Sequence, residues 1–173
     1  MKQELRIRFL EKRKENRSQE PFVINHLEKL VRDYANIALY MKINSEVDLH
    51  ALIDKLLLTH SLYFPIVKKE LEFRQMKSWK DLGVDRAHIA APLNGPVIDV
   101  AKLDVVIMPC IAANIYGYRL GYGKGYYDRA LKEYKGVIIG VVYENCLIED
   151  HFETINDVKM NYIVTEKRII KID

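Results

Sequence analysis

The sequence lacks the residue patterns on which several large classes of protein depend. Its two cysteines, Cys110 and Cys146, are too few for a disulfide framework, and neither belongs to a CxxC motif. Its five histidines show no ligand spacing, so no structural zinc is expected. No apolar run approaches the ~20 residues that span a bilayer, and the charged N-terminus has no signal-peptide core. We therefore expect a soluble, cytoplasmic protein without a membrane partner.

A strong excess of one charge is also missing. The net charge is +3, which is too small on its own to indicate nucleic-acid binding. The exception is local, because Lys and Arg outnumber Glu in residues 1–17. Either a solvated helix face or a site for an anionic ligand explains this excess. This segment could also belong to an RNA-binding domain, but the sequence contains no RRM- or KH-like signature, so no nucleic-acid partner is expected.

The chain has neither internal repeats nor low-complexity segments, and its 173 residues fit a single domain, 1–173. Near-continuous apolar strands alternate with helices after an N-terminal pair of helices. This pattern predicts an α/β fold with a mostly parallel sheet and helices on both faces, in three layers. The predicted helices cover 2–16, 18–35, 45–58 and 126–134, and the predicted strands cover 36–43, 61–67, 71–76, 103–109, 136–143 and 162–166.

Several local features refine these elements. Ser45, followed by Asp48, resembles a capping box and predicts a helix that begins there. Pro65 should mark the end of its strand. We expect 71–76 at the edge of the sheet and 162–166 as its last strand, with at most one helical turn in the irregular stretch between 77 and 96.

The segment RLGYGKGYYDR, residues 119–129, carries the most chemistry. Its glycines alternate, which allows positive φ and lets an anion approach backbone N–H groups. It then opens a helix, whose first N–H groups favour an anion, and Arg119 and Lys124 add charge. Parallel sheets bind ligands at the carboxyl ends of their strands, where the strand 103–109 leads into this segment. The segment is therefore predicted to bind phosphate rather than to form a plain turn.

The two common phosphate motifs do not match this segment. A P-loop needs Ser or Thr after the lysine, where Gly125 stands, and the dinucleotide fingerprint needs a glycine at Tyr126. Asp128 and Asp157 could each pair with a nearby base or hold Mg²⁺ beside a phosphate, and the residues alone favour the ion pair. The tyrosines of the segment could stack on a flat ring or pack the loop.

RLGYGKGYYDRAL resembles the signature of the 5-formyltetrahydrofolate cyclo-ligase family. Weaker similarities follow in the family's order along nearly the whole chain: KQELR, ALYMKINSEVDLHALI, LYFPIV, LDVVIMP, GVVYENCLIE and INDVKMNYIVTEKRII. The resemblance implies a monomeric enzyme that converts 5-formyltetrahydrofolate to 5,10-methenyltetrahydrofolate. ATP and Mg²⁺ are required, and ADP and phosphate are released. It also leaves open a non-catalytic folate- or nucleotide-binding module of the same fold.

The resemblance also implies roles for individual residues. It assigns ATP binding to Lys2, Arg6, Arg119, Gly121, Gly123, Lys124, Gly125, Tyr126 and Tyr127, with Arg6, Lys124 and Arg119 acting in catalysis. It assigns the folate to Met41, Glu46, Tyr122 and Tyr126, and Mg²⁺ to Asp128 and Asp157.

The sequence departs from the family pattern at four positions. Cys110 replaces a glycine, Ala113 and Asn114 replace a Phe-Asp pair, and Asn161 replaces a frequent Asp. The lost phenylalanine should loosen the folate pocket and the lost aspartate should remove a hydrogen bond. We expect these changes to affect substrate affinity rather than reaction type.

Overall fold

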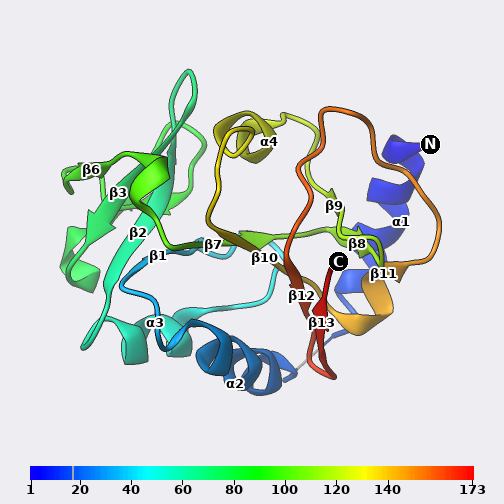
Figure 1. Cartoon of the computed structure of the whole chain (residues 1–173), viewed down its shortest axis with the longest axis horizontal. Helices are drawn as coiled ribbons and strands as arrows, with labels where there is room; N and C mark the ends of the chain where they lie inside the picture. Colours follow the sequence, from blue (N-terminus) through cyan, green and yellow to red (C-terminus); the bar gives the residue numbers. More distant parts are fainter. Residues whose placement is uncertain (17) are drawn as a thin grey trace.

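A computed structural model describes residues 1–16 and 18–173. Its centre is an eight-stranded sheet in the order β13-β12-β10-β7-β1-β2-β3-β6 (Figure 1). The strands from β12 to β2 in this order are parallel, whereas β13, β3 and β6 pair antiparallel at the two sides. The predicted α/β fold is confirmed. The strands are β1 (Asn36–Ala38), β2 (Ser61–Val67), β3 (Leu71–Met76), β6 (Val97–Ile98), β7 (Val105–Pro109), β10 (Val137–Val141), β12 (Tyr162–Val164) and β13 (Ile169–Lys171).

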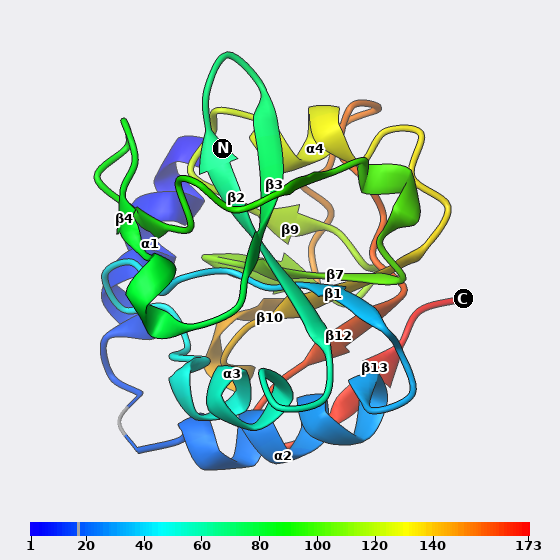
Figure 2. The same ribbon diagram turned by 90° about the vertical axis from the view of Figure 1, so that its left-hand side faces the viewer.

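Helices cover both faces of the sheet, as predicted. Figures 1 and 2 show α2 and α3 on one side and α1 and α4 on the other. Alternating side chains of β7 explain this arrangement: Val105 and Ile107 join one buried cluster, and Val106 and Met108 join the other. The two N-terminal helices therefore lie on opposite faces. The helices are α1 (Lys2–Arg13), α2 (Glu20–Val31), α3 (His50–Leu56) and α4 (Tyr126–Ala130).

Smaller elements extend the carboxyl end of β7. A three-stranded sheet in the order β11-β8-β9 follows it, and β9 leads into the glycine-rich segment. Segment 119–129, which begins with β9, therefore lies beyond the carboxyl end of β7, as predicted, with β8 between them (Figure 1). The remaining elements are β4 (Gly83–Val84), β5 (Ala90–Ala91), β8 (Ala112–Asn114), β9 (Arg119–Leu120), β11 (Leu147–Ile148) and three 3-10 turns, Trp79–Asp81, Val100–Lys102 and Glu144–Cys146.

The prediction that Pro65 ends its strand is wrong. Pro65 lies inside β2, opposite Phe73 of β3. The carbonyl of Tyr63 accepts a hydrogen bond from the N–H of Leu39, so the backbone groups of Tyr63 point toward β1. Every second residue of a strand points the same way, so the backbone nitrogen of Pro65 also faces β1. Because proline has no N–H, the ladder between β1 and β2 does not continue past the bond from Leu39 to Tyr63; β1 ends at Ala38, whereas β2 continues against β3.

The expected start of the third helix is also wrong. The helix α3 begins at His50, whose N–H donates to the Asp48 carboxylate. Ser45 caps no helix, and its hydroxyl instead accepts a hydrogen bond from Arg13. Residues 45–49 form a loop instead of a helical turn, and the side chains of Val47 and Leu49 in this loop are buried in the core.

Both expected sheet borders were misplaced. The short strand β6 pairs with β3 and takes the edge position predicted for 71–76. At the opposite side β13 pairs antiparallel with β12, so 162–166 does not hold the last strand. Strands of two or three residues bury too few side chains to leave a pattern in the sequence.

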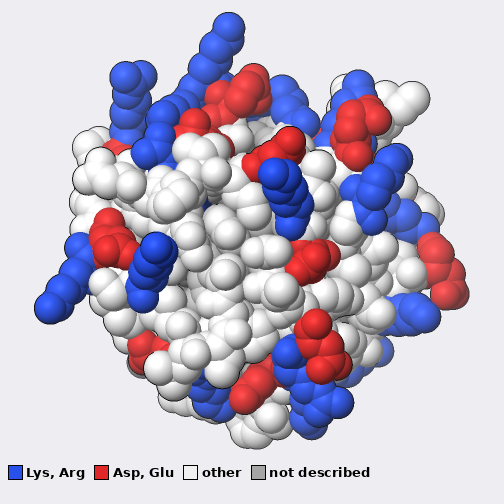
Figure 3. All heavy atoms as spheres, turned by 60° about the vertical axis from the view of Figure 1, so that its left-hand side comes forward, with Lys and Arg blue, Asp and Glu red and all other residues white. Residues whose placement is uncertain are grey.

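Charged side chains on the face shown in Figure 3 lie around a broad uncharged area, with both signs interspersed. Among the described residues, no helix has the length and apolar character needed to cross a bilayer.

The cluster beneath β1 and β2 should dominate stability. Phe64 is fully buried there, so we expect Phe64→Ala to lower the free energy of unfolding by about 3–5 kcal/mol through lost burial and an unfilled cavity. Urea denaturation followed by circular dichroism measures the change. Phe22→Ala is the matched control, since Phe22 is 58% exposed and its loss should cost less than 1 kcal/mol. Equal losses from the two variants would contradict this assignment of the core.

Candidate active site

A cavity of about 590 Å³ opens at the carboxyl ends of the central parallel strands. Tyr40 and Met41 reach it just after β1, Pro65 and Val67 from β2, and Pro109 from the end of β7. This is the position at which open parallel sheets bind ligands.

Every residue assigned to a site by the sequence lines this one cavity. They come from four separate parts of the chain, and the structure brings together Lys2, Arg6, Met41, Glu46, Arg119, Gly121, Tyr122, Gly123, Lys124, Gly125, Tyr126, Tyr127, Asp128 and Asp157. The structure gives their location, and their roles stay predictions.

Two groups of side chains can be distinguished in the cavity. We call the glycine-rich loop 121–125, without the Tyr122 side chain, together with Lys2, Arg6 and Arg119 the loop subsite. We call Met41, Glu46 and Tyr122 the carboxylate subsite.

The backbone of the loop subsite needs glycine at two positions. Gly123 has φ +96° and Gly125, which precedes α4, has φ +66°, a region that other residues rarely adopt. A Cβ on Gly123 would also come within 3.2 Å of the Arg6 guanidinium. Arg6 itself donates from Nε to the carbonyl of Gly121 at 2.7 Å, so α1 is docked onto the loop.

The charges of the loop subsite are arranged in pairs. Lys2 Nζ lies 2.6 Å from Asp157 Oδ2, and Arg119 Nη2 lies 3.0 Å from Asp128 Oδ2. Arg119 is largely buried against the Tyr127 ring, and its Nε has no hydrogen-bond partner among the described residues. The Lys124 side chain is exposed at the cavity and makes no ion pair with any residue the structure describes. Positive charge is therefore available for an anion.

Asp128 and Asp157 are the carboxylates that pair with Arg119 and Lys2. Burial acts to raise the pKa of Asp157, but hydrogen bonds from Lys2 and Thr154 outweigh it and hold the pKa below its usual value. The N–H of Val158, next to Asp157, donates to Asp128 Oδ1 at 3.2 Å, which joins the two segments. The ion pairs that the residues alone favoured are thus present.

These carboxylates can be tested for a magnesium site. The described residues contain no group of three or more His, Cys, Asp or Glu that could form a protein cage for a metal. Mg²⁺ commonly binds through one or two carboxylates together with substrate phosphates and waters. Two carboxylates that line the same cavity as a phosphate-type loop fit that donor set.

The carboxylate subsite contains a buried acid. Glu46 is 3% exposed, and its Oε2 accepts a hydrogen bond from the N–H of Ile43 at 3.0 Å. Burial raises the pKa of Glu46 to about 7, against the opposing effects of the Ile43 hydrogen bond and of the Arg13 charge. A carboxylate at the wall of a cavity can accept two N–H bonds from a planar ligand.

Sequence reasoning missed one wall of the cavity. Pro65, Val67 and Leu71 from the β2–β3 hairpin face Ala87 and Ile89 from the following loop. Asp85 fixes that loop, because its carboxylate accepts hydrogen bonds from the N–H groups of residues 67, 87 and 89. Neither part left a signal in the sequence: residues 61–67, SLYFPIV, are apolar almost throughout, and the alternating burial that turns positions 65 and 67 toward the cavity appears only in the structure.

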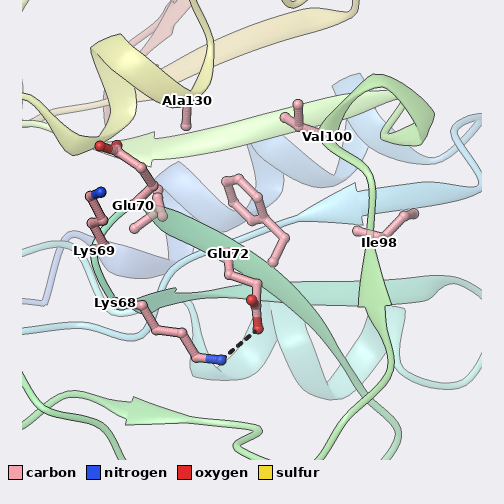
Figure 4. A pocket seen from close by; sticks show the side chains of 9 residues that line it. Lys68, Lys69, Glu70, Glu72, Ile98, Val100 and Ala130 are labelled. Carbon is pink, nitrogen blue, oxygen red and sulfur yellow. Dashed lines mark ion pairs between the residues drawn. The ribbon is translucent and has the colours of Figure 1, made fainter.

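A second, shallower hollow of about 360 Å³ lies beside β3 and does not match this chemistry (Figure 4). Its Lys68 is paired with Glu72 at 3.3 Å, and no glycine lines it. The first cavity is therefore the candidate active site.

Comparison with known proteins identifies the family of the chain. The family model described as the 5-formyltetrahydrofolate cyclo-ligase family matches residues 1–166. The chain belongs to this family. The membership predicted from the glycine-rich segment is thereby confirmed, and with it the prediction of an enzyme family.

Relatives of the family cover most of the chain. The 5-formyltetrahydrofolate cyclo-ligase of Escherichia coli K12 is 28% identical over 143 residues, which are 77% of this chain and 79% of that protein. The solution structure of the Aquifex aeolicus 5,10-methenyltetrahydrofolate synthetase has a TM-score of 0.89 at 35% identity and covers 98% of this chain and 92% of that one. The Mycoplasma pneumoniae 5,10-methenyltetrahydrofolate synthetase, with a TM-score of 0.76 at 23% identity, covers 95% and 98% and shares the fold.

The four departures from the family pattern lie outside the lining of the cavity. Asn114 binds the Glu153 carboxylate and the N–H of Tyr118, and Asn161 accepts from the N–H of Ile138. Ala113 is buried in β8, and Cys110, the residue that follows β7, is also buried. The expectation that they alter the folate pocket directly has no support in the structure, since their contacts are internal to the fold.

Proposed function

We propose that this protein catalyses the ATP- and Mg²⁺-dependent conversion of 5-formyltetrahydrofolate to 5,10-methenyltetrahydrofolate, with release of ADP and phosphate. The observation that carries the proposal is the single cavity that combines the loop subsite, suited to phosphates, with the buried Glu46 of the carboxylate subsite. Action as a monomer in the cytoplasm stays a prediction.

The reaction needs activation of an unreactive group. The formyl oxygen attacks the γ-phosphorus of ATP, an O–P bond forms, and the bond to ADP breaks. N10 of the folate then attacks the formyl carbon, loses its proton, and closes the ring as the C–O bond breaks and phosphate leaves. The enzyme has mainly to align two substrates and neutralise charge.

The residues of the cavity suit these tasks. Lys2, Arg6 and the loop N–H groups would hold the ATP phosphates, while Lys124 and Arg119 would stabilise charge on the transferring group. Glu46 would accept the pterin N–H groups. Bound Mg²⁺, held by Asp128 and Asp157, would neutralise phosphate charge. The tyrosines 122, 126 and 127 would pack against the folate and the nucleotide.

The proposed mechanism uses no nucleophile from the protein. Burial raises the pKa of Cys110 to about 12 and that of Cys146 to about 11, so both are thiols at neutral pH. Transfer of phosphate directly between the substrates is consistent with these inert cysteines.

An absorbance assay tests the proposal. Purified protein with Mg²⁺, ATP and 5-formyltetrahydrofolate should generate the absorbance band of methenyltetrahydrofolate, and each omission should abolish it. Tight binding of 5-formyltetrahydrofolate without ATP consumption would instead support a non-catalytic folate-binding module. Absence of both product and binding would overturn the proposal.

The magnesium assignment gives a further prediction. We expect Asp157→Asn to raise the Mg²⁺ concentration needed for half-maximal rate on the order of tenfold or more, since one of two carboxylate ligands is lost. A magnesium titration at saturating substrates measures this. Asp150→Asn is the matched control, because Asp150 is an exposed acid in the same loop and does not line the cavity. Identical magnesium curves for both variants would remove Asp157 from the metal site.

A further inference from the structure

Arg13, at the end of α1, is a charged residue buried among the walls of the cavity without lining it. It is 1% exposed and belongs to the least exposed large side chains of the protein. Its guanidinium donates from Nε to Ser45 Oγ at 3.0 Å, from Nη1 to the Cys110 carbonyl at 3.2 Å, and from Nη2 to the Tyr122 hydroxyl at 2.9 Å. One side chain thus satisfies three acceptors.

The three acceptors belong to three different segments, and each segment continues into the cavity. Ser45 precedes Glu46, Cys110 follows Pro109 at the end of β7, and Tyr122 lies in the glycine-rich loop. Arg13 therefore links the loop after β1, the end of the central strand and the loop subsite from behind.

The position of Arg13 on its helix connects it to the other cations. Lys2, Arg6 and Arg13 are separated by four and seven residues, which places them along one face of α1. Residues 6 and 13 are separated by about 10 Å along the axis. The same helix face thus carries the cations of the loop subsite at one end and supports the carboxylate subsite at the other.

Burial of this charge needs an explanation beyond packing. An apolar side chain of similar volume commonly serves a buried position as well or better, because a buried guanidinium loses its hydration. Among the described residues Arg13 makes no ion pair, and all three of its acceptors are neutral. Its charge acts at longer range on the buried Glu46, whose pKa it lowers.

We infer that Arg13 is a positioning residue for the folate: it holds Tyr122 and the Ser45–Glu46 segment in the geometry that receives the pterin. This inference rests on the function proposed above. Arg13 touches neither substrate in this view and acts through its partners.

Other groups around Glu46 have to be considered for any pH effect. The titratable and charged groups that act on Glu46, or on which it acts, are Arg13 from α1, Arg119 from β9, Tyr122 from the glycine-rich loop, Tyr40 after β1, Cys110 after β7 and Tyr127 from α4. Arg13 and Arg119 are the cations in this set, so removal of Arg13 leaves Glu46 with one.

The test compares Arg13→Met, Arg13→Lys and the control Arg8→Met, in which an exposed arginine of the same helix is changed. For Arg13→Met we expect the KM for 5-formyltetrahydrofolate to rise at least tenfold while the KM for ATP changes less than twofold. The acidic limb of the pH profile of kcat/KM for the folate should move to higher pH. Arg13→Lys keeps the charge but cannot reach three acceptors, so KM should rise with the pH limb in place. Arg8→Met should match the wild type.

Equal increases of both KM values with an unmoved pH limb would overturn the inference, because they would mean that Arg13 only anchors α1. If Arg13→Met does not fold, an unchanged folate KM in Arg13→Lys would overturn it as well. A carbon-13 NMR titration of the Glu46 carboxyl, without substrates, separates this inference from the proposed function. It should show a higher pKa in Arg13→Met even if the wild type proves inactive, and an unchanged pKa would refute the charge effect.

Discussion

Lys124→Ala is expected to lower kcat on the order of 10²- to 10³-fold while the protein stays folded. The ammonium of Lys124 lies exposed at the cavity without an ion pair among the described residues, so its charge is free to follow the phosphoryl group as it moves. Removing one group that stabilises transition-state charge typically costs this much. The KM for 5-formyltetrahydrofolate should change little, since Lys124 lies in the loop subsite. The absorbance assay at saturating substrates measures the effect.

Lys69→Ala is the matched control for this change. Lys69 is also an exposed lysine, but it lines the shallow hollow beside β3 (Figure 4). Its replacement should leave kcat within a factor of about two, and neither variant should shift the melting temperature, because surface substitutions cost little stability. A Lys124→Ala enzyme that retains the wild-type kcat would refute the catalytic role of Lys124.

The parts of the site that sequence reasoning located are those encoded locally. The alternating glycines and their lysine form one continuous segment, and the phosphate interpretation needed only positive φ and the following helix. The structure provides both at Gly123 and Gly125. The carboxylates 128 and 157 also proved to lie on the same cavity. Their ion pairs with Arg119 and Lys2 are present in the structure, and their role as metal ligands stays a prediction.

The parts that escaped prediction depend on contacts between distant segments. Ala87 and Ile89 line the cavity because Asp85 holds their loop against β2. The residues around them in the sequence give no indication of this contact. Ser45 is a residue type that often caps a helix, but its hydroxyl instead accepts a hydrogen bond from the buried Arg13, 32 residues earlier. Arg13 belongs to a basic segment that reads equally well as a solvated helix face. Its spacing from Lys2 and Arg6, and from the apolar Leu5 and Phe9, indicates that it faces inward.

Glu46→Gln is expected to lower kcat/KM for 5-formyltetrahydrofolate about 100-fold, mainly through KM, with the KM for ATP nearly unchanged. The amide keeps the shape of the side chain but presents one acceptor oxygen, so charge-assisted bonds to the pterin N–H groups are lost. In the wild type, kcat/KM for the folate should fall as the pH drops below about 7, because burial raises the pKa of Glu46 to about 7 and protonation removes the acceptor charge. In Glu46→Gln this limb should disappear. Glu149→Gln, an exposed acid outside the cavity, is the control and should keep both the rate and the pH limb.

Stability gives an independent check on the same carboxyl. The folded protein binds the Glu46 proton with a pKa of about 7, and the unfolded chain does so near 4.5, so between these values the folded state holds more protons. The free energy of unfolding should therefore fall as the pH rises from about 4.5 to 7, and Glu46→Gln should be less sensitive to pH over that interval. Urea titrations of the two proteins at several pH values measure the difference. Parallel curves would mean that Glu46 has an ordinary pKa and a solvated environment, and the loss of kcat/KM in the variant would then have to come from shape rather than from charge.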